Sequence, residues 1–164
     1  MISALRTSVL FILIMTLITG VFYPVTVMLV GQGLFKYKTN GSLIMRDDEI
    51  IGSELIGQKF TQRGYFYSRP SYAGDRHDGK IPVDLVTASA SGLDPHISVA
   101  AAYYQIPRIA RDRKIPGKKV MELIDRNTEK RLLWIFGEDR VNVLLLNLRL
   151  DDMMRGNDKV RYEK

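Results

Sequence analysis

Two serines lie close in the sequence to an aspartate and a histidine, the residue types that form a serine nucleophile with its base. Ser89 and Ser91 precede Asp94 and His96 by a few residues. In a serine hydrolase, the histidine takes the proton of the serine hydroxyl and an acidic residue orients the histidine. The Gly-x-Ser-x-Gly string of a nucleophile turn does not occur here, although a triad can also be assembled from distant residues. The favoured interpretation is that serine and aspartate make turn and cap bonds and that His96 is a loop residue.

Metal and nucleotide sites of known motif types are not indicated. The chain has two histidines, His77 and His96, and no cysteine, so neither a metal cluster nor a disulfide framework is expected. The string at residues 31–33, Gly-Gln-Gly, lacks the third glycine and the strand-turn-helix setting of a dinucleotide loop. No Gly-x-x-x-x-Gly-Lys-Ser/Thr string occurs either. The lack of cysteine is compatible with either side of a membrane.

The net charge of +6 is unevenly distributed along the chain. Six basic residues fall within residues 108–119 and are opposed only by Asp112: Arg108, Arg111, Arg113, Lys114, Lys118 and Lys119. Such a run is usually a solvated helix face, and we favour that interpretation over an acidic partner surface or lipid headgroups. Nucleic acid is the weakest alternative, because the chain has no recognised binding motif and carries a membrane anchor.

The element that organises the chain is the uncharged run from Val9 to Val30. A bilayer core about 30 Å thick takes roughly 20 helical residues, so this run predicts one transmembrane helix. Pro24 is expected to kink it, and Gly20 with the kink leaves a small face that a neighbouring helix could approach. Threonine hydroxyls within the run are expected to bond back to their own helix.

Two questions about this helix stay open at the level of composition. A secretory signal has a similar start, but its apolar core is shorter, and residues 18–20 match a cleavage site poorly, which favours an uncleaved anchor. Arg6 favours a cytoplasmic amino terminus, whereas Lys36 and Lys38 on the other flank nearly cancel that preference. Charge alone therefore leaves the orientation undecided.

The remaining residues are enough for one compact domain, and the predicted fold class is α+β. We expect residues 1–35 to form a cytoplasmic amino terminus and the anchor, and residues 36–164 to form a soluble domain with a mainly antiparallel sheet and several short helices. Strands are predicted at residues 42–46 and 49–52 as a hairpin, continuing through 55–58, and at 83–86 and 144–151. Helices are predicted from Val99, capped by Ser98, from Arg108, and over residues 118–131, with a loop at 71–82 and a frayed tail at 157–164.

Several strings resemble the C subunit family of the Kdp potassium-transporting ATPases. They occupy residues 17–24, 40–44, 52–60, 65–71, 105–108 and 141–148. The most specific is Thr-Ala-Ser-Ala-Ser-Gly-Leu-Asp-Pro-His-Ile-Ser at residues 87–98, following an amino-terminal anchor. The family-motif residues in this loop are Thr87, Ser89, Ser91, Gly92, Asp94 and His96. Members commonly carry a longer Ser-, Gly- and Asn-rich insertion where this chain has only residues 72–81.

The resemblance implies a non-catalytic subunit in the plasma membrane, with a single-pass helix, its amino terminus in the cytoplasm and its domain outside. The implied partners are a potassium-channel-like subunit, which handles potassium, a P-type ATPase subunit and a small single-helix subunit. The family is also described as raising the ATP affinity of the hydrolysing subunit. Direct contact with ATP would require donors such as Gln105 and Arg108. In the favoured alternative, Gln105 bonds locally, the arginines face solvent or an acidic partner, and the effect passes through the anchor and the complex.

Overall fold

The computed structural model describes residues 2–46, 49–70, 81–131, 133, 135–155 and 161–162. The fold is α+β, as predicted, and the chain divides into two compact units, residues 1–42 and residues 43–163. The predicted loop at 71–82 and the Asp47-Asp48 turn fall largely outside the described residues, as does His77.

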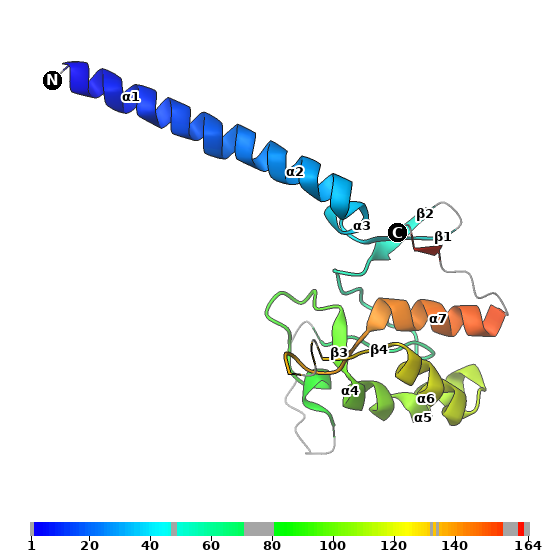
Figure 1. Cartoon of the computed structure of the whole chain (residues 1–164). Coiled ribbons are helices and arrows are strands. Elements are labelled where there is room, and N and C mark those ends of the chain that lie inside the picture. Colours follow the sequence, from blue (N-terminus) through cyan, green and yellow to red (C-terminus); the bar gives the residue numbers. More distant parts are fainter. Residues whose placement is uncertain are drawn as a thin grey trace. The chain divides into compact units, whose positions relative to one another are not determined.

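The first unit is a long apolar helix followed by one short turn of helix. Its elements are α1 (Ile2–Leu17), a π-helical turn η1 (Ile18–Phe22), α2 (Tyr23–Leu34) and α3 (Lys36–Thr39). Together Ile2–Leu34 form a continuous 33-residue helix that is long and apolar enough to cross a membrane (Figure 1). Thr19 Oγ1 donates to the Met15 carbonyl at 2.7 Å and Thr26 Oγ1 to the Phe22 carbonyl at 2.8 Å. These two bonds confirm that threonine hydroxyls are satisfied within the helix.

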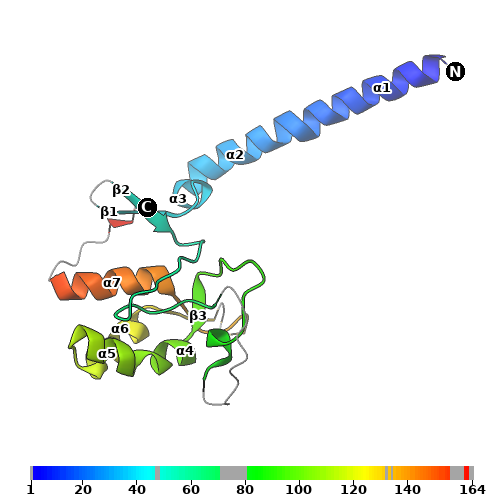
Figure 2. The same cartoon turned by 180° about the vertical axis from the view of Figure 1, so that it is seen from behind.

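The predicted kink at Pro24 is not seen. Figures 1 and 2 show the helix passing this position without a sharp bend. The reason is the wide π turn immediately before it, in which the Tyr23 N–H donates to the Ile18 carbonyl five residues back. Such a turn makes room for a proline ring, which in a regular helix would clash with the carbonyl four residues earlier.

The second unit contains two small antiparallel sheets and five helical segments in its described residues. One sheet has the strand order β2-β1-β6 and the other β3-β5-β4. The strands are β1 (Leu43–Arg46), β2 (Glu49–Ser53), β3 (His96–Ser98), β4 (Thr128–Glu129), β5 (Arg140–Asn142) and β6 (Arg161–Tyr162). The helical segments are the 3₁₀ turn η2 (Val83–Leu85), α4 (Val99–Tyr104), α5 (Ile106–Arg113), α6 (Gly117–Arg126) and α7 (Val143–Arg155).

Helix α7 corrects the predicted strand at residues 144–151. In both views it lies between the β1–β2 hairpin and helices α4 to α6 (Figures 1 and 2). Leu144 and Leu148 pack on Ile44 of the hairpin. Val143, Leu146 and Leu150 face a larger cluster formed with residues of α4, α5 and α6. A helix buried on two opposite sides has leucines around most of its circumference, and that produced the alternating pattern typical of a strand.

Four further predictions are wrong in detail. Strand β2 ends at Ser53, whose hydroxyl accepts a hydrogen bond from the Leu55 N–H, so the strand does not continue through residues 55–58. Residues 83–85 form a 3₁₀ turn instead of a strand, and α6 ends at Arg126, before β4. Within the predicted frayed tail, Arg161–Tyr162 pair with β1. Short segments such as these depend on tertiary pairing more than on local propensity.

Other local predictions are confirmed. The hairpin forms, with a bulge between Ile44 and Met45. Ser98 caps α4 by accepting a hydrogen bond from the Ala101 N–H at 3.1 Å. Pro107 lies in the first turn of α5 and Pro116 precedes α6, both positions where a missing N–H costs nothing.

Candidate functional site

An extended segment without regular pairing passes through the centre of the domain, and two side-chain amides hold it. The Phe66 N–H donates to Asn147 Oδ1 at 2.8 Å, and Asn147 Nδ2 donates back to the Phe66 carbonyl at 3.0 Å. The Tyr67 N–H donates to Gln105 Oε1 at 2.8 Å, and Gln105 Nε2 donates to the Tyr67 carbonyl at 3.2 Å. We call these two pairs the amide clamps.

The amide clamps supply this segment with the backbone hydrogen-bond partners that a neighbouring strand supplies in a sheet. Phe66 is fully buried, and Asn147 and Gln105 are 1% and 5% exposed. Backbone groups buried in this way need a partner, because water cannot reach them. A carboxamide offers one acceptor and a pair of donors in one plane, and so matches one residue of extended backbone. The segment is thereby fixed between α7 and α4–α5.

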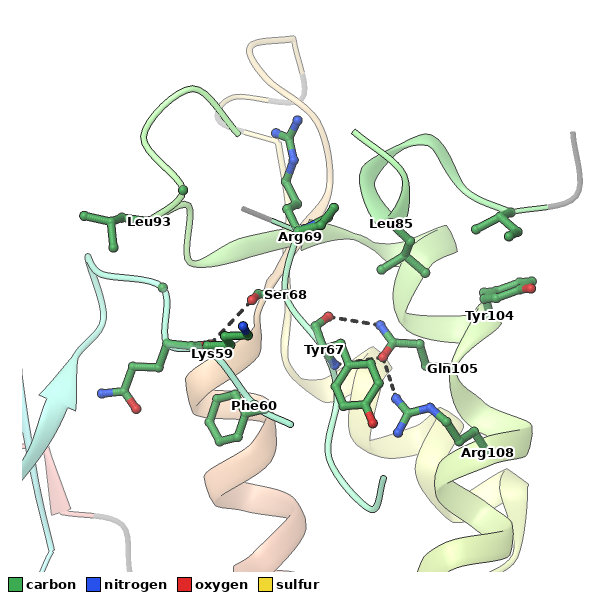
Figure 3. Close-up of a pocket in the computed structure, with 15 residues that line it drawn as sticks. Lys59, Phe60, Tyr67, Ser68, Arg69, Leu85, Leu93, Tyr104, Gln105 and Arg108 are labelled. Carbon is green, nitrogen blue, oxygen red and sulfur yellow. Dashed lines mark hydrogen bonds between the residues drawn. The ribbon is translucent and has the colours of Figure 1, made fainter. Parts of the chain in front are cut away.

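Gln105, a candidate for nucleotide contact, has no hydrogen-bonding capacity left for a ligand in this arrangement. Besides its two bonds to Tyr67, its Nε2 donates to the Ala101 carbonyl at 3.3 Å and its Oε1 accepts from the Arg108 guanidinium at 2.7 Å (Figure 3). The amide therefore uses both donors and both acceptor positions within the domain. This geometry favours the local role of Gln105.

Arg108 and Arg113 of α5 also face the extended segment. Arg108 donates to the carbonyls of Arg63 and Tyr65, and its guanidinium lies 3.9 Å from the centre of the Tyr67 ring. Arg113 donates to the Gly64 carbonyl and lies over the Tyr65 ring, with an ion pair to Asp151 at 2.8 Å. Burial lowers the pKa of Arg108, against the opposing influence of Tyr67 and Asp112.

The basic run of residues 108–119 is therefore divided between two roles. The members that are exposed to solvent are Arg111, Lys114, Lys118 and Lys119. The two arginines that face inward hold backbone carbonyls by charge-assisted hydrogen bonds and stack on tyrosine rings. Only the exposed members fit the predicted solvated helix face.

A cavity of about 800 Å³ adjoins the Gln105 clamp. Its described lining includes three basic side chains, Lys59, Arg69 and Arg108, and no acidic one. Apolar groups from Phe60, Leu85 and the exposed Leu93 contribute to the remainder, together with Tyr104 (Figure 3). The cavity is thus lined by basic and apolar groups, of which Arg108 is already bonded to the carbonyls of Arg63 and Tyr65.

Arg69 organises the family-motif loop. Its guanidinium forms an ion pair with Asp94 at 3.1 Å and donates to Thr87 Oγ1 and to the Ala88 carbonyl. Asp94 in turn accepts from the His96 N–H at 3.0 Å, and the Leu93 carbonyl accepts from the Gly57 N–H at 2.8 Å. Gly92 has a positive φ of 67°, a conformation that glycine adopts without steric cost. Thr87, Gly92 and Asp94 thus act in the folding of the loop itself.

The residues that suggested a serine nucleophile do not come together as a triad. Ser91 Oγ accepts from the Leu93 N–H, and the Ser89 carbonyl accepts from the Gly92 N–H. Across the residues that the structure describes, neither serine hydroxyl is hydrogen-bonded to His96. The imidazole of His96 instead lies 3.9 Å from Asp94 Oδ1 and 3.7 Å from Glu129 Oε1. The turn-and-cap interpretation accounts for these contacts, and the geometry does not favour hydrolase chemistry.

Two ionisable groups near this loop have shifted pKa values. Burial lowers the pKa of His96, with Arg140 acting in the same direction and Glu129 and Asp94 opposing it. Burial would raise the pKa of Asp84, but hydrogen bonds from the Ser98 side chain and backbone outweigh it, and the pKa is lowered. His96 is thus held neutral and Asp84 charged near pH 7, as expected for groups that stabilise a fold.

Comparison with known proteins agrees with the motif resemblance. The sequence model of the family described as "KdpC: K+-transporting ATPase, c chain" matches residues 5–79 and 72–152. The chain belongs to this family. A potassium-transporting ATPase KdpC subunit from Acidobacterium capsulatum is 44% identical, with 91% of this chain and 98% of that protein covered. KdpC subunits from Yersinia enterocolitica and Clostridium perfringens are 44% and 40% identical, with 91% and 92% of this chain and 92% and 98% of those proteins covered.

The match of this KdpC-family chain to the Acidobacterium protein includes positions that the chain lacks. The comparison with the Acidobacterium protein extends over 180 positions but covers 91% of 164 residues, about 149, so about 31 positions lack a counterpart here. The two matched parts of the family model meet at residues 72–79. The shortened insertion was predicted at residues 72–81, which include this overlap.

Two residues of the site in this KdpC-family chain were not identified from its sequence. Asn147 is the polar residue within a leucine-rich run, and a buried polar residue in such a run is the available signal for a hydrogen bond to backbone. Arg69 lies in a motif string, but its partners Asp94 and Thr87 are distant in sequence. Only the folded arrangement brings them together.

Proposed function

We propose that the chain is a non-catalytic, single-pass subunit of a potassium-transporting ATPase complex, which it assembles and stabilises. The observation that carries the proposal is the family match over nearly the whole chain, joined to one apolar helix long enough to span a bilayer. The relatives named above are potassium-transporting ATPase subunits. The proposed topology has the amino terminus in the cytoplasm, the helix in the plasma membrane and the domain outside.

The proposed partners are a potassium-channel-like subunit, a P-type ATPase subunit and a small single-helix subunit. We propose that these partners, and not this chain, bind potassium and ATP. The exposed basic residues of α5 and α6, Arg111, Lys114, Lys118 and Lys119, supply a positive surface suited to an acidic partner. The same domain would also keep the family-motif loop in one conformation through Arg69 and Asp94.

The effect on ATP affinity is proposed to be indirect. Gln105 and Arg108 are the strongest candidates for phosphate contact, and their hydrogen bonds are directed at the extended segment. With the domain outside and the nucleotide in the cytoplasm, coupling would pass through the anchor helix and the assembled complex. Such coupling requires only that the complex with this subunit and the complex without it differ in ATP affinity.

The assembly role predicts an effect of Gly20→Leu. A Cβ added at Gly20 would meet no other part of the chain within 4 Å, so we expect the substitution to leave this helix intact. In lipid, small residues let two helices approach closely, and leucine at such a position blocks the approach. We expect most of the intact complex to be lost when it is purified from membranes through a tag on another subunit.

Leu13→Ile is the matched control for Gly20→Leu, because it changes the shape of an exposed side chain on the same helix without adding bulk. Complex recovery should be unchanged in this variant. Equal recovery of intact complex with Gly20→Leu and with Leu13→Ile would remove Gly20 from the helix interface.

A further inference from the structure

The connection between β4 and β5 carries an unusual apolar tip. Residues 132–136 read Leu-Leu-Trp-Ile-Phe and include the sole tryptophan of the chain. Of these, Leu133, Ile135 and Phe136 are 71%, 76% and 63% exposed. Leu133 also has a positive φ of 53°, a conformation that is uncommon for a residue with a branched side chain. We call Leu133, Ile135 and Phe136 the apolar tip.

Charged residues at the base of this connection pair with one another. Lys130 Nζ contacts Asp139 Oδ2 at 2.9 Å, and the Arg131 N–H donates to Asp139 Oδ1 at 3.1 Å. On the adjoining strands, Arg140 Nε contacts Glu129 Oε2 at 2.9 Å. The hairpin base is therefore closed by opposite charges, which leaves little net charge next to the apolar tip.

We propose that the apolar tip inserts into the surface layer of the membrane that the anchor helix crosses. Tryptophan, phenylalanine and leucine side chains are typical of loops and helices that lie in the lipid interface. The Lys130–Asp139 and Arg140–Glu129 pairs behind them lower the cost of bringing the hairpin base to the headgroups, because these four charges already have partners. The occupant favoured by this chemistry is lipid, because a small, exposed and nearly neutral apolar tip matches a fluid apolar surface.

The anchor helix, which keeps the domain near the membrane, makes such a small contact effective. This inference rests on the proposed membrane span. Helix α2 ends at Leu34 and the domain begins at Leu43, and the residues between them could extend over at most about 30 Å. A few apolar side chains alone bind a bilayer weakly. When the same chain is already anchored, the second contact is intramolecular and its effective concentration is high. The tip would then restrict how the domain turns on its anchor.

Trp134 provides the test, because it is the only tryptophan of the full chain. The full-length protein is reconstituted into phosphatidylcholine vesicles, and its fluorescence is measured with acyl-chain-brominated lipid and, separately, with aqueous iodide. We expect brominated lipid to remove most of the emission and iodide to have little effect. In the double variant Ile135→Asp/Phe136→Asp, this order should reverse.

The matched control is Met121→Asp, which places one charge at a half-exposed apolar position of α6 and should leave the quenching pattern unchanged. Flotation of the same vesicles tests membrane insertion of the anchor helix separately. Protein that floats with the vesicles is anchored, whether or not the apolar tip contacts lipid. Trp134 that is quenched by iodide and not by brominated lipid in floating vesicles would overturn the proposal. Shielding of Trp134 that arises only when the other subunits are added would also overturn it, in favour of a protein contact.

Discussion

Asn147→Leu should lower the free energy of unfolding of the domain by about 2–6 kcal/mol, because each buried backbone group left without a partner costs about 1–3 kcal/mol. The substitution removes both bonds between Asn147 and Phe66, at 2.8 and 3.0 Å. Phe66 is fully buried, so water cannot replace the lost partner. Leucine branches at the same carbon as asparagine and favours the helix, so propensity does not account for the loss, although its larger volume adds some overpacking at this buried site. Urea denaturation of the full chain in detergent, followed by far-UV circular dichroism, measures the effect.

Asn127→Leu is the control for this experiment. Asn127 follows α6 and is half-buried, and its Nδ2 donates to the Leu123 carbonyl of the same helix. Removing one local bond at a site that water can reach should cost about 1 kcal/mol or less. If both variants unfolded at the same urea concentration, Asn147 would not be holding the extended segment.

Gly57→Ala should disturb the family-motif loop and destabilise the domain by about 1–3 kcal/mol, the usual cost of overpacking. A Cβ on Gly57 would lie 2.5 Å from the Asp94 carbonyl oxygen and 2.9 Å from its carbon. Both atoms belong to the backbone, so no side chain can rotate to relieve the clash. The Gly57 N–H to Leu93 bond and the Asp94 ion pair with Arg69 would be displaced together. Thermal unfolding of the purified chain and limited proteolysis at the loop measure the two consequences.

Gly117→Ala is the matched control. At this first residue of α6, an added Cβ would meet only the Ile106 Cγ2 methyl, at 3.3 Å. Alanine is also the better helix former, by about 0.5–1 kcal/mol in a helix interior, so the variant should be neutral or slightly more stable. Loss of stability in Gly117→Ala equal to that in Gly57→Ala would contradict the assignment of a specific close approach at Gly57.

The α+β class, the anchor, the hairpin and the Ser98 cap follow from local signals that a sequence carries: hydrophobic length, turn residues and capping side chains. Helix α7 does not, because its burial on two sides arises from the β1–β2 hairpin on one face and from α4 to α6 on the other. The leucines at residues 144, 146, 148 and 150 are equally compatible with a strand when those neighbours are unknown. The pairing of Arg161–Tyr162 with β1 is likewise a long-range contact.

The site was predictable in its residue types and not in its arrangement. Gln105 and Arg108 were identified as polar groups near the start of a helix, and two opposed roles were considered for them. Which role fits depends on an extended segment some forty residues earlier in the chain, whose backbone carbonyls and N–H groups face them. Asn147 was not identified from the sequence, because a lone asparagine among leucines resembles a solvent-facing position. Buried amides of this kind are recognised only when the backbone they serve is in view.

We propose that this chain influences an ATPase without itself binding nucleotide. The most direct measurement is equilibrium binding of ATP to the purified full-length chain in detergent, compared with Gln105→Ala and Arg108→Ala. We predict no saturable binding at millimolar ATP by any of the three, because the amide of Gln105 and the guanidinium of Arg108 are engaged with Tyr65, Tyr67 and each other. Saturable binding by the unsubstituted chain, lost in a variant whose circular dichroism spectrum is unchanged, would contradict the claim and place a nucleotide site on the chain itself.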